Sequence, residues 1–281
     1  MKIGARELFD QTLSRLKSGS AGERTSLIYW LLEDGFGINK TSIVVNESVE
    51  VDWDTLQSNI ERVNGEEPIQ QVLGFAWFRG KKFFVNRKVL IPRPETEELI
   101  DHVKKITPVE SNILDLGTGS GCIAVSLALE IPQSKVVALD ISEEALEVAR
   151  RNAGVLNARV DFHLQSMLTL DESFLNNQKF DTIVSNPPYV REGEKAEMER
   201  NVLDFEPHLA LFVSDKDPLI FYRAIAEIGL KRLKPGGNIL AEINSYLGEE
   251  TRALFKEMGY GDVCILQDFY GKDRFVQAKL A

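Results

Sequence analysis

The hydrophobic positions of the first quarter of the chain follow the period of amphipathic helices. Residues 52–63 also predict a helix. Short helices of this kind must bury their apolar stripes against one another, so we predict a small helical domain over residues 1–73. The apolar positions of its first two helices are Ala5, Leu8, Phe9, Leu13 and Leu16, followed by Leu27, Ile28, Leu31 and Leu32.

A different pattern follows between residues 75 and 91. This segment is rich in aromatic and β-branched residues, which surround Arg79-Gly80-Lys81 and Asn86-Arg87-Lys88. Such runs with polar turn residues between them are typical of a β-hairpin. We therefore predict a hairpin linker over residues 74–92.

From about residue 95 the chain alternates between apolar strands and helical patterns. This alternation predicts a mostly parallel sheet that is covered on both faces, in a catalytic domain over residues 93–281. Two later segments, 263–266 and 274–279, lie too close together for a parallel crossover, so we expect them to pair antiparallel. The earlier strands are expected at 113–117, 136–140, 180–185 and 238–243.

Composition narrows the class of protein. The chain has 281 residues and a formal net charge of -10, and no segment carries a block of Lys and Arg. This argues against general binding to nucleic acid. Cys122 and Cys264 both lie in apolar surroundings and are expected to be small buried hydrophobes. No apolar run reaches about 18 residues and the N-terminus lacks a secretory signal, so we expect no membrane partner and a cytoplasmic setting.

A glycine loop marks the expected cofactor site. Gly117, Thr118, Gly119, Ser120 and Gly121 follow a strand and precede an apolar helix. Glycines allow a tight turn and a close approach of a ligand to the backbone. The motif alone is weak, since an ordinary strand-to-helix corner also uses glycine.

Asp140 strengthens this interpretation. It ends the next strand 19 residues after Gly121, close to the spacing of a carboxylate that bonds ribose hydroxyls. Ser142 is expected to cap the helix that begins at Glu143. Two alternatives remain at this point: a dinucleotide, whose pyrophosphate needs open N–H groups at a helix N-terminus, and S-adenosylmethionine, which carries no phosphate.

The sequence Asn186-Pro187-Pro188-Tyr189 marks the expected acceptor site. It directly follows the strand at 180–185, at the edge of the sheet where ligands of open α/β folds bind. Two prolines remove two backbone donors but keep their carbonyl oxygens. The Asn186 amide oxygen and a proline carbonyl can therefore both accept hydrogen bonds from one NH2 group.

This arrangement suits methylation of a planar nitrogen. An amide or an aromatic amine has a delocalised lone pair, and two acceptors favour the electron-rich nitrogen that attacks a sulfonium methyl. Tyr189 can stack on the planar acceptor. In the alternative interpretation, the prolines only end a strand and Tyr189 packs on the surface. His102, His163 and His208 show no metal-binding spacing, so no metal is expected.

Four motifs together resemble the PrmC/HemK family of glutamine methyltransferases, and the resemblance covers nearly the whole chain. They are Ile91-Pro92-Arg93-Pro94-Glu95-Thr96-Glu97, Leu114 to Cys122, Val184 to Tyr189, and Phe205-Glu206-Pro207. The resemblance implies a Rossmann-like class I methyltransferase fold of seven strands, with S-adenosyl-L-methionine as cofactor. It also implies that the acceptor is N5 of the glutamine in the Gly-Gly-Gln tripeptide of class 1 peptide chain release factors.

The resemblance also implies residue roles. The small N-terminal domain would recognise the release factor, and no direct nucleic-acid partner is expected. For Arg93 two interpretations stand: proximity to the cofactor, or an ion pair with Glu95 or Glu97 at a helix start. The other implied positions are Gly117 to Gly121, Asp140, Ile141, Met167, Leu168 and Asn186 for the cofactor, and Asn186, Pro187, Pro188 and Tyr189 for the glutamine, with Asn186, Pro187 and Tyr189 catalytic.

The chain departs from the family pattern at three places. Ser166-Met167-Leu168 replaces the usual Ser-Asp-aromatic, so hydrophobic contact must replace a carboxylate near adenine. Residues 213–217 lack the usual glycines, and Glu242-Ile243-Asn244 replaces Glu-Ile-Gly. Two other functions are kept as alternatives: N-methylation of an exocyclic amine of a nucleobase, for which the base must be exposed, and a cofactor-binding assembly protein without transfer activity.

Overall fold

The chain divides into two compact units. A computed structural model describes residues 1–171, 173–174 and 178–281. The smaller unit contains Met1–Phe75 and Glu199–Phe205, and the larger unit contains Ala76–Met198 and Glu206–Ala281.

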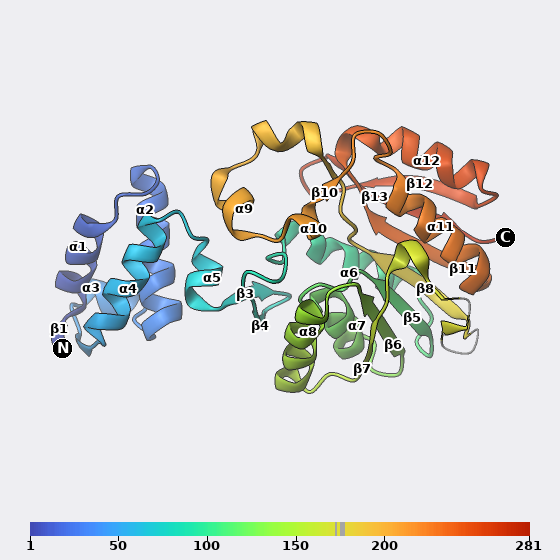
Figure 1. Cartoon of the computed structure of the whole chain (residues 1–281). Helices are drawn as coiled ribbons and strands as arrows, with labels where there is room; N and C mark the ends of the chain where they lie inside the picture. The colour runs from blue at the N-terminus through green and yellow to red at the C-terminus, as the bar shows by residue number, and fades with distance from the viewer. Residues whose placement is uncertain (172, 175–177) are drawn as a thin grey trace. The chain divides into compact units, whose positions relative to one another are not determined.

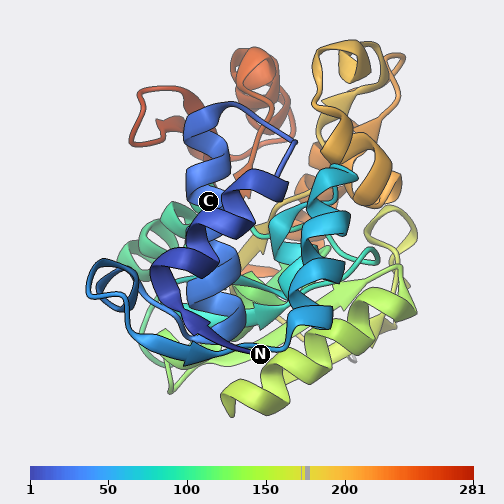
Figure 2. The same cartoon turned by 90° about the vertical axis from the view of Figure 1, so that its left-hand side faces the viewer.

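The smaller unit is built from short helices, as the apolar periodicity predicts. Figure 2 shows these N-terminal helices in blue and cyan. Ser20 begins α2 with a capping box to Glu23, and Asp52 caps α4 through the backbone N–H of Thr55. The elements are α1 (Ala5–Arg15), α2 (Ala21–Tyr29), the π-helical η1 (Trp30–Asp34), α3 (Lys40–Val44), α4 (Trp53–Asn64), α5 (Ile69–Leu73) and α9 (Arg200–Phe205).

The core of this unit lies between the predicted apolar faces. Leu8, Ile28, Leu31, Leu32 and Leu56 are fully buried there. The structure adds an antiparallel pair that the helical pattern does not predict, β1 (Lys2–Gly4) with β2 (Ser48–Glu50).

The hairpin is shorter than predicted. Its strands are β3 (Phe75–Phe78) and β4 (Lys81–Phe84), and the turn residues Arg79 and Gly80 both have positive φ, as a tight hairpin turn requires. The apolar residues after Phe84 do not form strands. Val85, Val89 and Ile91 are buried in a small cluster with Ala145 and Val148 instead.

The larger unit contains a seven-stranded sheet with the order β12-β13-β11-β8-β5-β6-β7 (Figure 1). β13 pairs antiparallel with both β11 and β12, and the remaining pairs are parallel. This confirms the mostly parallel sheet and the antiparallel C-terminal pair. The bounds are β5 (Asn112–Leu116), β6 (Lys135–Asp140), β7 (Val160–Leu164), β8 (Phe180–Ser185), β11 (Leu233–Glu242), β12 (Gly261–Gln267) and β13 (Asp273–Lys279).

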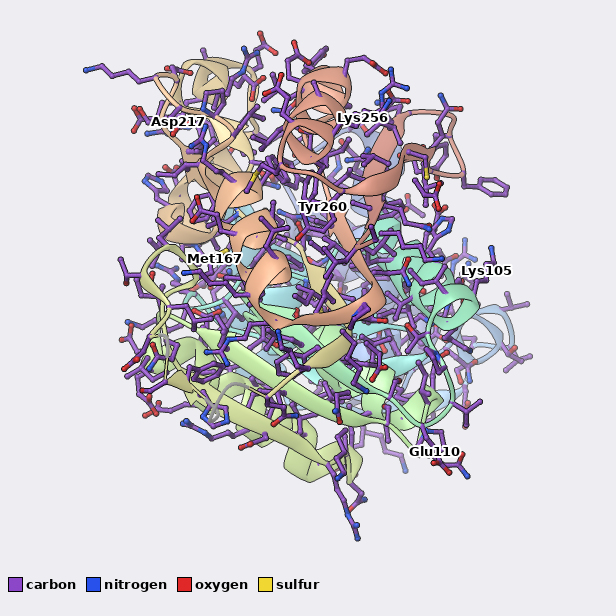
Figure 3. All side chains as sticks on the ribbon, turned by 90° about the vertical axis from the view of Figure 1, so that its right-hand side faces the viewer. Lys105, Glu110, Met167, Asp217, Lys256 and Tyr260 are labelled. Carbon is purple, nitrogen blue, oxygen red and sulfur yellow. The ribbon has the colours of Figure 1, made fainter. Side chains whose placement is uncertain are left out.

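Helices cover both faces of this sheet. Ile113 packs on the face of α6 (Pro94–Ile106), α7 (Cys122–Glu130) and α8 (Glu143–Leu156). Leu114 and Leu116 point to the other face, which α11 (Ile220–Arg232) and α12 (Gly248–Glu257) cover. Tyr260 is buried on this second face, whereas charged side chains such as Lys105 lie at the periphery (Figure 3).

Short elements complete the larger unit. They are η2 (Met167–Thr169), η4 (Glu192–Glu197), α10 (His208–Leu211), η5 (Ser245–Leu247), and the parallel pair β9 (Val190–Arg191) and β10 (Phe212–Val213). The prediction for the cysteines is half wrong. Cys122 is buried, but Cys264 is exposed, because side chains alternate along β12 and its neighbour Val263 takes the buried face.

Asn152 ties three parts of the larger unit together. Its side-chain oxygen accepts from Phe84 N at 2.7 Å, and its NH2 donates to Phe84 O at 3.0 Å and to Ser120 O at 2.8 Å. The side chain is 2% exposed. One amide therefore joins the hairpin, α8 and the glycine loop.

We expect Asn152→Ala to lower the free energy of unfolding by about 3 kcal/mol, because it leaves partly buried backbone groups of Phe84 and the buried Ser120 carbonyl without partners. Urea denaturation of the full chain measures this loss. Gln57→Ala, which removes an exposed side chain on α4, is the control and should change stability by less than about 0.5 kcal/mol. Equal losses in both variants would contradict the role of Asn152.

Candidate active site

The loop after β5 adopts the backbone that its glycines permit. Gly117, Gly119 and Gly121 all have positive φ, at 77°, 55° and 80°. No heavy atom of the described chain lies within 4 Å of a Cβ placed on Gly119, whereas a Cβ on Gly121 would lie 3.0 Å from that of Ala149. Gly119 therefore faces open space, and Gly121 is needed for close packing of α7 against α8.

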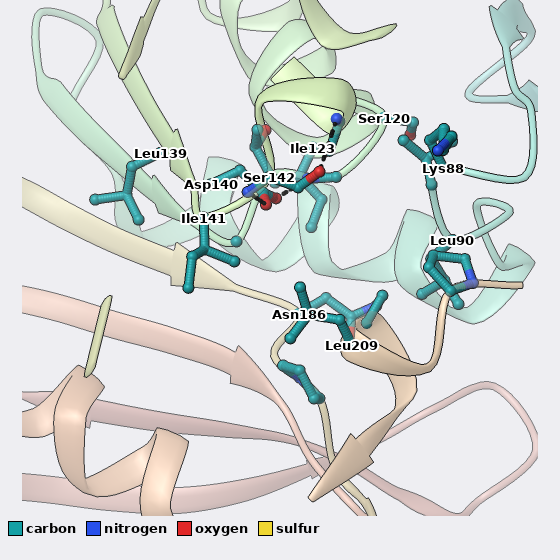
Figure 4. A pocket seen from close by; sticks show the side chains of 18 of the residues that line it. Lys88, Leu90, Ser120, Ile123, Leu139, Asp140, Ile141, Ser142, Asn186 and Leu209 are labelled. Atoms are coloured by element: carbon teal, nitrogen blue, oxygen red, sulfur yellow. Dashed lines mark hydrogen bonds between the residues drawn. The ribbon is translucent and has the colours of Figure 1, made fainter. Parts of the chain in front are cut away.

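A cavity of about 470 Å³ opens at the carboxyl ends of the strands (Figure 4). A volume of this size is typical of small-molecule sites. Three of the predicted site residues, Gly121, Pro187 and Tyr189, do not line this cavity. The cavity does bring together most of the predicted site residues: Arg93, Gly117, Thr118, Gly119, Ser120, Asp140, Ile141, Met167, Leu168, Asn186 and Pro188.

Asp140 connects the end of β6 to the glycine loop. Its two carboxylate oxygens accept from Gly119 N at 2.8 Å and from Ser142 N at 2.9 Å. Ser142 in turn accepts from Ala145 N at 3.1 Å and caps α8 as predicted. Burial raises the pKa of Asp140. A carboxylate has further lone pairs, so the predicted bond to ribose remains compatible with these contacts.

Apolar side chains form the neighbouring wall of the cavity. Ile141 is 56% exposed and Leu168 is 43% exposed, and both line it. Met167 also lines the cavity, but its side chain is buried, and its Cε would lie 2.9 Å from a Cβ placed on Gly117. Ile141 and Leu168 therefore offer apolar surface to a planar ligand, while Met167 supports the glycine loop.

Arg93 also lines the cavity, and its ion-pair partner is Glu206. The Arg93 guanidinium donates to Glu206 at 2.6 Å, and the other carboxylate oxygen accepts from Ile91 N at 2.9 Å. Of the two interpretations of Arg93, the ion pair with Glu95 or Glu97 is wrong: Arg93 pairs with Glu206, and Glu97 accepts from Arg79 N. The side chain of Glu206 is 1% exposed, so this bond fixes the segment from Ile91 to Arg93 at the cavity wall.

A buried network lies behind Asn186. The Asn186 side-chain nitrogen donates to Thr96 Oγ1 at 3.3 Å, and the Thr96 hydroxyl donates to Glu242 at 2.7 Å. Tyr189 donates its hydroxyl to the other Glu242 oxygen at 2.9 Å. Burial raises the pKa of Glu242, and the two hydroxyl donors oppose this shift. Asn186 Oδ1 is buried and, within the described part of the chain, has no hydrogen-bond partner.

Sequence reasoning did not assign roles to Thr96 and Glu242. The available signal was a carboxylate at the end of an apolar strand, Asn238 to Ile243, beside the strand that leads to Asn186. Such a carboxylate is buried and therefore needs donors.

Asn244 accounts for one departure from the family pattern. Its side-chain nitrogen donates to Tyr189 O at 3.0 Å and to Glu194 at 3.1 Å, and its oxygen accepts from Tyr246 N at 2.9 Å. A glycine could make none of these side-chain bonds. Asn244 therefore holds the end of the loop 186–189, which we call the acceptor loop.

The residues that the structure describes contain no group of three or more His, Cys, Asp or Glu side chains that could hold a metal ion. No described helix is both long and apolar enough to cross a membrane.

Asp115 is a buried carboxylate at the base of the site. Thr118 donates its hydroxyl to one oxygen at 2.7 Å, and the other oxygen has no partner among the described residues. Burial raises the pKa of Asp115 to about 7. The side chain therefore holds a proton at pH values where a carboxyl group of the unfolded chain, at about 3.9, has lost it.

This shift predicts how stability depends on pH. The contribution of Asp115 to the free energy of unfolding is complete below about pH 4 and is lost as pH rises through about 7, because only the folded chain holds the proton in that window. We expect Asp115→Asn to weaken the fall in stability across this window. Urea unfolding at several pH values measures it, and an unchanged pH dependence would contradict the shift.

Known proteins resemble this chain in sequence and in fold. Residues 109–264 match the family model described as "Methyltransferase domain". A crystal structure of a methyltransferase from Pyrococcus furiosus is 20% identical, with a TM-score of 0.53, covering 81% of this chain and 98% of that one. The 16S rRNA N2 G1207 methyltransferase of T. thermophilus, in complex with AdoMet and guanosine, is 17% identical with a TM-score of 0.52, covering 74% and 50%. These two similarities support the class I methyltransferase fold.

Three curated relatives are release factor glutamine methyltransferases. The protein of Bacteroides thetaiotaomicron is 50% identical over 79% of this chain and 80% of its own length. That of Flavobacterium psychrophilum is 41% identical over 91% of this chain and 91% of its own length. That of Neisseria gonorrhoeae is 43% identical over 78% of this chain and 78% of its own length. The chain belongs to the release factor glutamine methyltransferase family.

Proposed function

We propose that this chain transfers the methyl group of S-adenosyl-L-methionine to N5 of the glutamine in the Gly-Gly-Gln tripeptide of class 1 peptide chain release factors. The observation that carries the proposal is Asn186 Oδ1, a buried amide oxygen with no partner in the described chain, on a residue that lines the cavity. A buried acceptor of this kind needs a donor, and an amide NH2 supplies one. The relatives' names support the substrate class.

The residues around the cavity fit the cofactor. Gly119 leaves room for close approach to the backbone, and Asp140 retains lone pairs for ribose hydroxyls. Ile141 and Leu168 offer apolar contacts for the adenine plane. This agrees with Met167 standing where the family pattern has an aspartate. When bound, the cofactor supplies an electrophilic methyl group on a sulfonium.

The acceptor loop would hold and activate the nitrogen. We assign Asn186 Oδ1 and the carbonyl oxygen of Pro187 as the acceptors of its two hydrogens. Both acceptors stabilise the positive charge that develops as nitrogen attacks, so no strong base is needed. Pro188 lines the cavity beside Asn186, and Tyr189 would frame the site from behind through its bond to Glu242.

The N-terminal unit would recognise the release factor. This unit exposes large apolar side chains on its surface. Trp30 is 46% exposed, Val44 is 78% exposed and Val45 is 66% exposed. Exposed apolar groups of this kind are common where proteins bind one another.

A transfer assay tests the proposal. The full chain is incubated with labelled cofactor and either a release factor or nucleic acid, and any methyl group is mapped by mass spectrometry. We expect label on the glutamine of the tripeptide, and none on a release factor in which this glutamine is replaced by glutamate. Label on nucleic acid alone would instead support a nucleobase amine as acceptor. Cofactor binding without any transfer would support an assembly protein.

Two substitutions should separate acceptor from cofactor binding. Asn186→Ala should lower the transfer rate about 100-fold, because one acceptor at the reacting nitrogen is lost. Its affinity for S-adenosylhomocysteine should change less than about twofold. Asp140→Ala should weaken that affinity about tenfold, through lost bonds worth about 1–3 kcal/mol.

Calorimetry with S-adenosylhomocysteine and the transfer assay measure both effects. Glu110→Ala, which changes an exposed carboxylate before β5, serves as the control and should leave both quantities unchanged. Near-normal turnover of Asn186→Ala would contradict its role, and an unchanged dissociation constant for Asp140→Ala would contradict the ribose assignment.

A further inference from the structure

A hydroxyl and a carboxylate lie behind Asn186 and come from distant parts of the chain. Thr96 is in the first turn of α6, and Glu242 ends β11, 146 residues later. Ser185 pairs with Ala241 in the parallel register of β8 and β11, so Asn186 and Glu242 leave adjacent strands at the same level. Thr96 is 2% exposed and Glu242 is 1% exposed, and both are therefore shielded from water.

The chemistry of these groups gives the chain of hydrogen bonds one direction. A carboxylate only accepts, so the single hydroxyl hydrogen of Thr96 must point to Glu242. The Thr96 oxygen then has only lone pairs left to offer to Asn186. The Asn186 amide must therefore turn its NH2 to Thr96, at 3.3 Å, and keep its oxygen on the other side.

We propose that Thr96 and Glu242 are a positioning pair that fixes the Asn186 amide with its oxygen toward the acceptor, so that the site selects an NH2 group over a carboxylate. This inference rests on the proposed function and deepens it: the pair would make the enzyme choose glutamine over glutamate in an otherwise identical peptide. If the Asn186 amide were turned the other way, its NH2 would face the substrate and would bind the carboxylate of a glutamate instead.

The energetics favour this role over simple packing. A buried carboxylate is costly, and an apolar group of the same size would stabilise the fold at least as well. The Asn186 oxygen adds a second cost, because a buried acceptor without a partner in the described residues is worth about 1–3 kcal/mol of lost stability. This second cost is recovered when the oxygen binds a donor on the substrate.

Thr96→Val tests the pair, because it removes the hydroxyl and keeps nearly the same shape. We expect kcat to fall about tenfold. The preference for a release factor with glutamine over one with glutamate, measured as the ratio of Kd values by calorimetry with S-adenosylhomocysteine present, should be at least tenfold in the parent chain and fall to about threefold or less. The affinity for S-adenosylhomocysteine should stay within about twofold.

Two matched variants separate positioning from a general loss of packing. Thr96→Ser keeps the hydroxyl and should restore both the rate and the preference. Thr182→Val removes another fully buried hydroxyl, which lies on β8 and bonds Thr107 at the end of α6, and should leave both quantities unchanged. Melting temperatures of all variants show whether each is folded at the temperature of the assay.

A second variant keeps the test decisive if Thr96→Val does not fold. Glu242→Gln keeps the volume of the side chain, but its NH2 can donate to Thr96. The Thr96 hydroxyl can then donate to Asn186, so the orientation of the Asn186 amide is no longer fixed and the preference for glutamine should fall as well. A preference that persists in Thr96→Val or Glu242→Gln, or one that Thr182→Val loses equally, overturns the pair alone. Absence of transfer by the parent chain overturns the proposed function, and the pair with it.

Discussion

The register of the parallel strands is the constraint on which the site depends. Leu116 pairs with both Leu139 and Ser185, and Ser185 pairs with Ala241. The glycine loop, Asp140, Asn186 and Glu242 therefore leave the sheet at one level and at one edge. A slip of one residue in any of these strands would turn its terminal side chain to the opposite face. The apolar residues buried on both faces resist such a slip, so core packing also sets the geometry of the site.

Two buried carboxyl groups at this edge of the sheet have similar surroundings. Asp115 accepts a hydrogen bond from the Thr118 hydroxyl, and Glu242 accepts one from the Thr96 hydroxyl. Burial raises the pKa of both carboxyls, which means that folding places each in a poor environment for charge. In each case the carboxyl group accepts the hydrogen of a neighbouring hydroxyl. Orientation of loop residues is thus obtained at some cost in stability, as is common near functional sites.

Much of this arrangement could be predicted from the sequence, because it depends on local patterns. Long apolar runs gave the strands at 113–117 and 180–185, and the cap at Ser142 follows from its position before Glu143. Contacts between distant segments could not be predicted in this way. The bond from Arg93 to Glu206 spans 113 residues and depends on how the loops pack. The role of Gly121 likewise needs the neighbouring helix, since Ala149 is what excludes a side chain there.

Two of the three departures from the family pattern act on the same part of the chain. Asn244 binds Tyr189 O and Glu194, while Asp215, in the segment without the usual glycines, accepts from Gly193 N at 3.1 Å. Both substitutions thus reach the same short segment that follows the acceptor loop. β9 in this segment also pairs with β10. Ser185 is held in β8 before Asn186, and these contacts hold the backbone from Tyr189 onward. Asn186 thus lies between two held points, and its amide turns mainly about its own side-chain bonds. That remaining freedom is the one that Thr96 and Glu242 remove.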